Sequence, residues 1–193
     1  MREIAPGLFH WTAPHPGWDP EGEPGSPADW PEQVGCTLYE APGAAVFIDP
    51  LVPGELWPEL DAVVAARPVV VLTTIRFHGR SRAEVLARYD GTTALPAGVD
   101  ALPFGDFQET MYSLPGPAAL VPGDLLIGDG EGGVRICPGS WLHGSMEGGG
   151  PGVVALREAL RSLLELPVEH VLLSHWSPVI GGGHAALERA LGD

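Results

Sequence analysis

The stretch that decides the fold runs Val69-Val70-Val71-Leu72-Thr73-Thr74-Ile75-Arg76-Phe77-His78-Gly79-Arg80-Ser81. Its first four residues form a continuous apolar run, which is typical of a central strand covered on both faces. A polar loop follows, and Ser81 with Glu84 three residues later has the spacing of a capping box. The segment therefore predicts a buried strand, a loop and then a helix that ends near Tyr89.

The patterns on either side of this stretch predict further strands and helices. Segments 36–40 and 45–49 flank Pro42-Gly43, which is a hairpin signal, and residues 55–66 carry one apolar helical face. Later in the chain we expect strands at about 107–114, 118–121, 125–127 and 133–136, a helix over 153–164, a buried strand at 170–174 and a helix from about His184 to Leu191. This order predicts layered sheets enclosed by helices in one domain that covers residues 1–193.

Composition excludes some functions. The net charge is −15, and the ten basic residues are all arginine. Such an acidic chain does not suit nucleic acid or an anionic membrane, because both need a basic surface. No run approaches the roughly 20 apolar residues of a membrane-spanning helix, and the first residues lack the apolar core of a signal peptide. We therefore expect a cytoplasmic protein, with oligomeric state open.

The sequence also contains two isolated cysteines and a long loop near its start. Cys36 and Cys137 lack metal-binding spacing, so we expect them to be reduced core residues. The region 13–33 is rich in proline and glycine, which predicts a long loop. The aromatic residues in or near it either form an apolar lid over a ligand or anchor the loop: His10, Trp11, His15, Trp18 and Trp30. Trp141, His143 and Trp176 are candidates for the same cleft.

Four segments, in order along the chain, resemble the metallo-β-lactamase superfamily. They are Val46-Phe47-Ile48-Asp49-Pro50, the stretch from Leu72 onward, Leu120-Val121-Pro122-Gly123-Asp124, and Val171-Leu172-Leu173-Ser174-His175-Trp176-Ser177-Pro178. The resemblance implies an α/β fold with a four-layer αβ/βα sandwich and mixed sheets. It also implies that the loop after Leu72 corresponds to the family's main metal-binding loop, His-x-His-x-Asp-His.

The resemblance also implies that several metal ligands of the family are missing from this chain. The four ligand positions of that loop hold Thr74, Arg76, His78 and Gly79, and threonine and glycine cannot replace imidazole ligands. Asp124 and His175 match the later ligands, whereas the family's further histidine has no counterpart near Leu114-Pro115-Gly116-Pro117. A centre with two metal ions is therefore not expected.

Two alternatives remain for this site. His78, Asp124 and His175 could hold a single divalent ion, zinc foremost, since three ligands and a water make a catalytic zinc site. Alternatively there is no metal, and Arg76 fills the vacated space and pairs with Asp124, because a buried carboxylate needs a cationic partner. In either case the resemblance implies a cleft lined by Thr74, Arg76, His78, Arg80, Asp124 and His175.

Three functions follow from these alternatives. The leading hypothesis is a metallo-β-lactamase-fold protein with a degraded metal centre and no conventional dinuclear zinc hydrolase activity, whose cleft binds a small molecule or a partner protein. The second is a mononuclear metal-dependent hydrolase that uses His78, Asp124 and His175. The third is a structural or oligomeric subunit with a non-functional cleft. The catalytic residues and the substrate stay unassigned, because the family covers thioester, lactone, β-lactam and phosphodiester chemistry.

Overall fold

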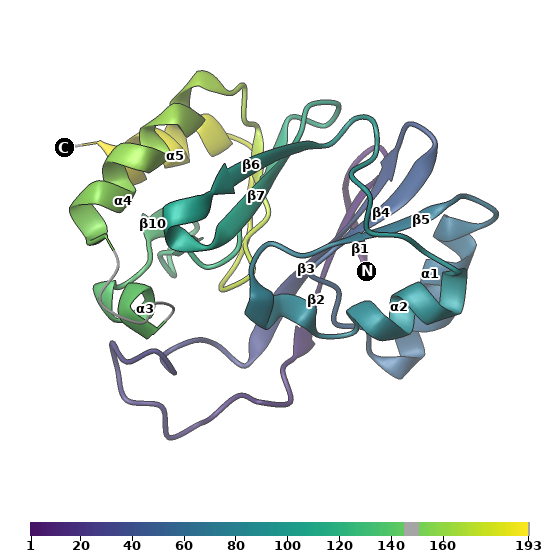
Figure 1. The fold of residues 1–193 in the computed structure, drawn as a ribbon, viewed down its shortest axis with the longest axis horizontal. Coiled ribbons are helices and arrows are strands. Elements are labelled where there is room, and N and C mark those ends of the chain that lie inside the picture. Colours follow the sequence, from purple (N-terminus) through teal and green to yellow (C-terminus); the bar gives the residue numbers. More distant parts are fainter. Residues whose placement is uncertain (145–150, 193) are drawn as a thin grey trace.

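Two five-stranded sheets form the centre of the molecule (Figure 1). The computed structural model describes residues 1–144 and 151–192. The strands of the first sheet, in spatial order, are β1 (Arg2–Ala5), β2 (Leu8–Pro14), β3 (Gln33–Ala41), β4 (Ala44–Ile48) and β5 (Val69–Leu72). Neighbours are antiparallel except β4 and β5, which run parallel with Val46 opposite Val70. A parallel pair needs a crossover connection, and helix α1 (Trp57–Val64) provides it.

The second sheet is also mixed. In spatial order its strands are β12 (Val179–Ile180), β11 (His170–Val171), β8 (Ala119–Val121), β7 (Glu109–Leu114) and β6 (Asp100–Phe104). Only β11 and β8 are parallel. A separate two-stranded ribbon joins β9 (Leu126–Gly128) to β10 (Val134–Ile136).

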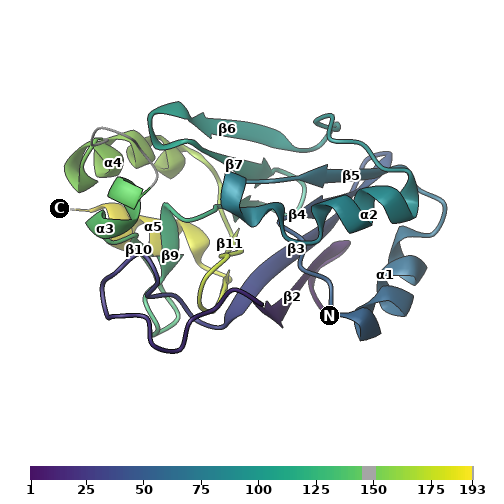
Figure 2. The same cartoon turned by 60° about the horizontal axis from the view of Figure 1, so that its bottom comes forward.

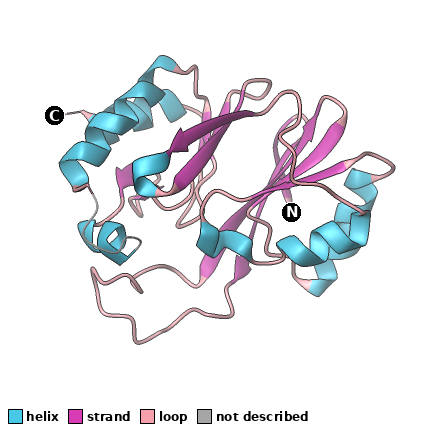
Figure 3. Cartoon of the chain, in the orientation of Figure 1, coloured by secondary structure: helices cyan, strands magenta, loops and turns pink. Residues whose placement is uncertain are grey.

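Three apolar clusters show how the layers stack. One joins the facing surfaces of the two sheets, with Ile48 and Leu72 on one side and Leu114 and Val121 on the other. The second packs α1 and α2 (Arg82–Tyr89) on the outer face of the first sheet. The third packs α4 (Val153–Leu160) and α5 (Gly183–Leu191) on the second sheet. Figures 2 and 3 show these helices on the two outer sides, which confirms the predicted four-layer αβ/βα sandwich.

Most predicted elements are present, with corrections at their ends. The hairpin, the strand at 69–72 and the helix that ends at Tyr89 are confirmed. Ser81 occupies the N-cap position of α2, as predicted, but the predicted capping hydrogen bond is wrong, because its hydroxyl accepts the Val52 N–H at 3.0 Å instead. The predicted strand 170–174 pairs with β8 only over His170–Val171. Beyond Val171 the chain crosses to the first sheet, where the backbone carbonyl oxygen of Ser174 accepts the Gly35 N–H at 2.8 Å.

Two remaining expectations concern cysteines and membranes. Cys36 and Cys137 are free and buried, as predicted for core residues. In the described ranges 1–144 and 151–192, no helix has the length and apolar character to cross a bilayer.

The crossing near Gly35 gives a first prediction. A Cβ atom at Gly35 would lie 2.1 Å from the Leu173 carbonyl oxygen, which belongs to backbone and cannot move aside. We expect Gly35→Ala to lower the free energy of unfolding by about 1–3 kcal/mol, because overpacking forces the backbone apart. Denaturant unfolding measures this loss, with Gly54→Ala as the control, since no heavy atom lies within 4 Å of its added Cβ. Equal stability of the two variants would contradict the close approach.

Candidate functional site

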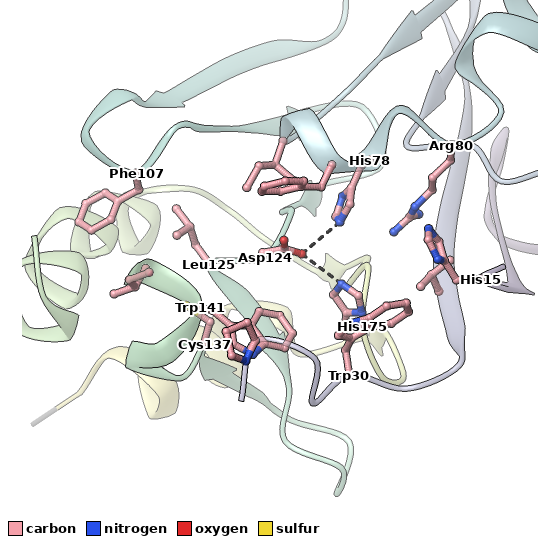
Figure 4. A pocket seen from close by; sticks show the side chains of 15 residues that line it. His15, Trp30, His78, Arg80, Phe107, Asp124, Leu125, Cys137, Trp141 and His175 are labelled. Carbon is pink, nitrogen blue, oxygen red and sulfur yellow. Dashed lines mark hydrogen bonds and ion pairs between the residues drawn. The ribbon is translucent and has the colours of Figure 1, made fainter. Parts of the chain in front are cut away.

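Three side chains from three strand ends converge at one edge of the sandwich. His78 lies in a 3₁₀ turn, Arg76–Gly79, soon after β5; Asp124 follows β8, and His175 follows β11. The Nε2 atoms of both histidines lie 3.1 Å from Oδ1 of Asp124 (Figure 4). Their candidate ligand atoms all lie within 4.8 Å of one another. These are the three residues that the sequence indicated for a single ion.

Asp49 fixes the orientation of His78 from behind. Its Oδ2 lies 2.8 Å from Nδ1 of His78, and its Oδ1 accepts the Thr74 N–H at 2.9 Å. This hydrogen bond occupies Nδ1 and directs Nε2 toward Asp124. Asp49 has φ of +49°, a conformation that aspartate tolerates better than most residues. Sequence reasoning missed this role, although Asp49 directly follows a buried strand.

Charge is concentrated at this buried site. Burial lowers the pKa of His78, but the carboxylates of Asp49 and Asp124 outweigh it and raise that pKa to about 9. Burial likewise raises the pKa of Asp124, and the two histidines outweigh it and hold that pKa well below its usual range. For His175, burial dominates and lowers the pKa. Near neutral pH, Asp124 is therefore an ionised carboxylate between a protonated His78 and a neutral His175.

A second acid, Glu109, holds the turn that carries Asp124. It is 2% exposed and accepts the backbone N–H groups of Gly123, Asp124 and Leu125 at 2.9, 2.7 and 3.0 Å. Burial, and after it the nearby Asp124 carboxylate, raises the pKa of Glu109 to about 8, while the three N–H groups oppose this rise. Glu109 was not predicted from the sequence, since its partners are 14 to 16 residues further along the chain.

A cavity of about 310 Å³ opens in front of the three-residue cluster. Its wall is mostly apolar and contains Trp30, Phe77, Phe107, Leu125, Trp141 and Leu142 (Figure 4). The volume and character are those of a small-molecule pocket. His78, Arg80, Asp124 and His175 line it, as the sequence indicated for a cleft.

The long early loop covers part of this pocket. His15, Pro27 and Trp30 belong to the lining, whereas Trp11 and Trp18 act as anchors by donating to the carbonyls of Leu51 and Trp30. The loop is tied across the pocket to α3 (Gly139–Gly144), because Ser140 Oγ donates to Gly25 O and Trp141 Nε1 donates to Ser26 O. Trp176 stacks on Trp141, and the side chain of His143 is outside the described part.

Two predicted cleft residues are placed elsewhere. Thr74 is buried behind the pocket, where its hydroxyl donates to Asp49. Arg76 is exposed, with its guanidinium 4.5 Å from the centre of the Phe77 ring. The predicted Arg76–Asp124 pair is therefore wrong, because the 3₁₀ turn directs His78 inward, and Asp124 takes two imidazoles as partners.

The donor set fits one divalent metal ion. Two imidazole nitrogens and a carboxylate oxygen form the ligand set of several catalytic zinc sites, and the Asp49–His78 hydrogen bond is the support that such a ligand requires. In the described part of the chain, no second group of three or more histidine, cysteine or acidic residues has metal-binding proximity.

Comparison with known proteins supports the fold. No protein-family model and no curated protein matches the chain. Among solved structures, the DIM-1 metallo-β-lactamase matches with a TM-score of 0.61 at 10% identity, over 98% of this chain and 93% of that one. The mono-zinc form of an NDM_FIM-1-like metallo-β-lactamase from Erythrobacter litoralis matches with 0.60 at 15% identity, over 98% and 93%. A metallo-β-lactamase family protein from Thermus thermophilus matches with 0.52 at 14% identity, over 97% and 79%.

Proposed function

We propose that the protein, whose chain has the metallo-β-lactamase fold, is a hydrolase with a mononuclear centre, in which His78, Asp124 and His175 hold one divalent ion. The observation that carries the proposal is the proximity of the three ligand atoms, within 4.8 Å. Zinc is the expected ion, because two imidazoles with one carboxylate suit it.

The proposed centre holds one metal ion, whereas the full ligand set of the family holds two. Thr74 and Gly79 supply no imidazole at positions where the resemblance implies ligands, and the guanidinium of Arg76 is exposed. A bound ion of this kind polarises the scissile bond and activates water. The protein supplies the remainder: Asp49 orients His78, Glu109 holds the Asp124 turn, and the apolar wall excludes bulk water.

The substrate class follows from the pocket. A volume of about 310 Å³ with a largely aromatic and aliphatic wall suits a small molecule with an apolar body. The mono-zinc neighbour shows that a structurally similar protein has been observed with one zinc ion. The identity of the hydrolysed bond is not part of this proposal, because one fold carries several chemistries.

The test is the metal content of the purified protein, measured by plasma mass spectrometry before and after incubation with zinc, manganese or iron. We expect about one ion per chain in the wild type and strong loss in His175→Ala, because a ligand is removed. His184→Ala is the matched control, since that half-exposed imidazole lies on α5. A metal-free wild type after zinc incubation would overturn the proposal.

One observation favours a second candidate function, a metal-free small-molecule binding protein. Asp124 already has two imidazole partners at 3.1 Å, so its charge is compensated without an ion. This alternative predicts thermal stabilisation by small apolar compounds and none by zinc. The metal measurement separates the two functions.

A further inference from the structure

Arg80 contributes a fixed positive charge to the pocket wall. Its backbone has φ of +31°, a conformation that costs energy for a residue with a side chain. Its Nη1 donates to the carbonyl oxygens of Gly35 and Asp49 at 2.8 and 3.0 Å. Figure 4 shows the side chain extending toward the His15 ring, on the same side of the pocket as His78. The two carbonyls therefore hold the guanidinium in one place.

The charge of this guanidinium is not compensated by an acid. Within residues 1–144 and 151–192, Arg80 forms no ion pair, whereas Arg67, Arg88 and Arg161 pair with Glu40, Asp61 and Glu158. Its Nε atom is buried without a hydrogen-bond partner in this part of the chain. Its Nη2 atom makes no hydrogen bond to the described residues and, unlike Nε, is not buried. A half-buried cation of this kind favours an anionic partner.

The neighbouring groups do not supply that partner. Asp124 is shared between His78 and His175, so its negative charge is already used. Burial, and then the positive charge of Arg80, lowers the pKa of His15, which also lines the pocket. The pocket wall therefore holds one positive charge that no acidic group among the described residues pairs with, in a protein whose net charge is −15.

From these observations we propose that Arg80 is the anion-binding residue of the pocket, and that the ligand is a small monocarboxylate with an apolar body. The carboxylate accepts hydrogen bonds from the guanidinium, and the body lies against the aromatic wall formed by Trp30, Phe77, Phe107 and Trp141. This inference names the substrate class of the proposed hydrolase and rests on it for the reaction, although binding itself requires no metal.

The test compares two probes of similar shape, 2-naphthoate and the uncharged 2-naphthamide, by isothermal titration calorimetry. One series contains a chelator and the other contains saturating zinc. In the chelated wild type we expect naphthoate to bind about tenfold or more tightly than naphthamide, which is the size of a hydrogen bond to a charged group. Equal affinities, or no binding of either probe, would overturn the proposal.

Variants assign the preference to one residue. Arg80→Gln should remove the preference for naphthoate and leave the naphthamide affinity unchanged. Arg82→Gln is the matched control, because it removes the same charge from an exposed position two residues further along. Arg80→Lys keeps the charge without the planar fork and should retain part of the preference. If Arg80→Gln keeps the full preference, Arg80 is not the anion-binding residue.

The two series separate this proposal from the hydrolase. A naphthoate preference that appears only with zinc would mean that the ion receives the carboxylate, so the Arg80 proposal fails while the metal centre stands. A preference in the chelated protein, together with no zinc uptake, would support Arg80 and refute the metal-dependent hydrolase.

Discussion

Replacing Asp49 by alanine is expected to lower the free energy of unfolding by about 3–5 kcal/mol, the cost of removing one partner from a buried charged pair. The carboxylate is 2% exposed and accepts hydrogen bonds from the Thr74 N–H and hydroxyl, and it pairs with Nδ1 of His78. The alanine variant leaves the Thr74 N–H without this acceptor, while the Thr74 hydroxyl and Nδ1 of His78 retain their 3.1 Å contact with each other. Chemical denaturation of wild type and variant measures the loss.

The backbone of Asp49 requires its own control, because alanine is strained at a positive φ. Asp90 has the same φ of +49°, but it is exposed at the C-terminus of α2. Asp90→Ala therefore measures the backbone cost alone, which we expect to be about 1–2 kcal/mol at most. If Asp49→Ala costs no more than Asp90→Ala, the buried hydrogen bonds of Asp49 contribute little.

Asp49→Asn separates stability from metal binding. Asparagine tolerates the positive φ, but its amide can donate to Nδ1 of His78. That hydrogen bond favours the tautomer with the proton on Nε2. A protonated Nε2 has no free lone pair, so this atom cannot bind a metal ion. We expect the asparagine variant to fold and to bind zinc about 10–100-fold more weakly, as seen when outer-shell partners are removed. Unchanged zinc affinity in a folded variant would mean that Asp49 does not set the tautomer.

The elements that could be predicted from the sequence are those whose patterns involve residues close together in the chain. The apolar run Val69–Leu72, the hairpin around Pro42-Gly43 and the helical stripe after Val153 each form from neighbouring residues. The missed strand β6 contains Pro103 and has mostly exposed or half-buried residues, so it has no strand pattern. The pairing with β7 determines its conformation instead.

Only some residues of the candidate site could be predicted from the sequence, because the roles of the others depend on tertiary structure. Family resemblance pointed to His78, Asp124 and His175, which the structure brings together. It also placed Arg76 in the site, because counting positions along a motif assumes the same backbone path. Here a 3₁₀ turn carries His78 inward and leaves Arg76 exposed. Asp49 and Glu109 were missed because their roles depend on tertiary hydrogen bonds that no sequence spacing reveals.

Glu109 leads to the second large effect. Glu109→Ala removes the acceptor of three backbone N–H groups, from Gly123, Asp124 and Leu125. A buried unsatisfied donor costs about 1–3 kcal/mol, so we expect the variant to lose about 3–5 kcal/mol of unfolding free energy, because water entering the vacated space recovers part of the total. Denaturant unfolding, followed by tryptophan fluorescence, measures this loss.

The matched control is Glu169→Ala. Glu169 also accepts a backbone N–H, from Gly182 at 3.3 Å, but it is exposed, so water can replace its carboxylate. We expect this control to change stability by about 0.5 kcal/mol or less. The difference between the two variants therefore reports the combined effect of burial and of the two additional hydrogen bonds of Glu109.

The zinc affinity of a Glu109→Gln variant tests whether Glu109 also positions Asp124. In a folded Glu109→Gln variant one carbonyl oxygen still accepts, but the amide NH₂ faces N–H donors, so the turn must shift. Asp124 then moves relative to His78 and His175, and we expect zinc affinity to fall although all three ligands are present. If zinc affinity stays at the wild-type value while stability falls, Glu109 supports the fold alone, and the geometry of the centre is set by the ligands and Asp49.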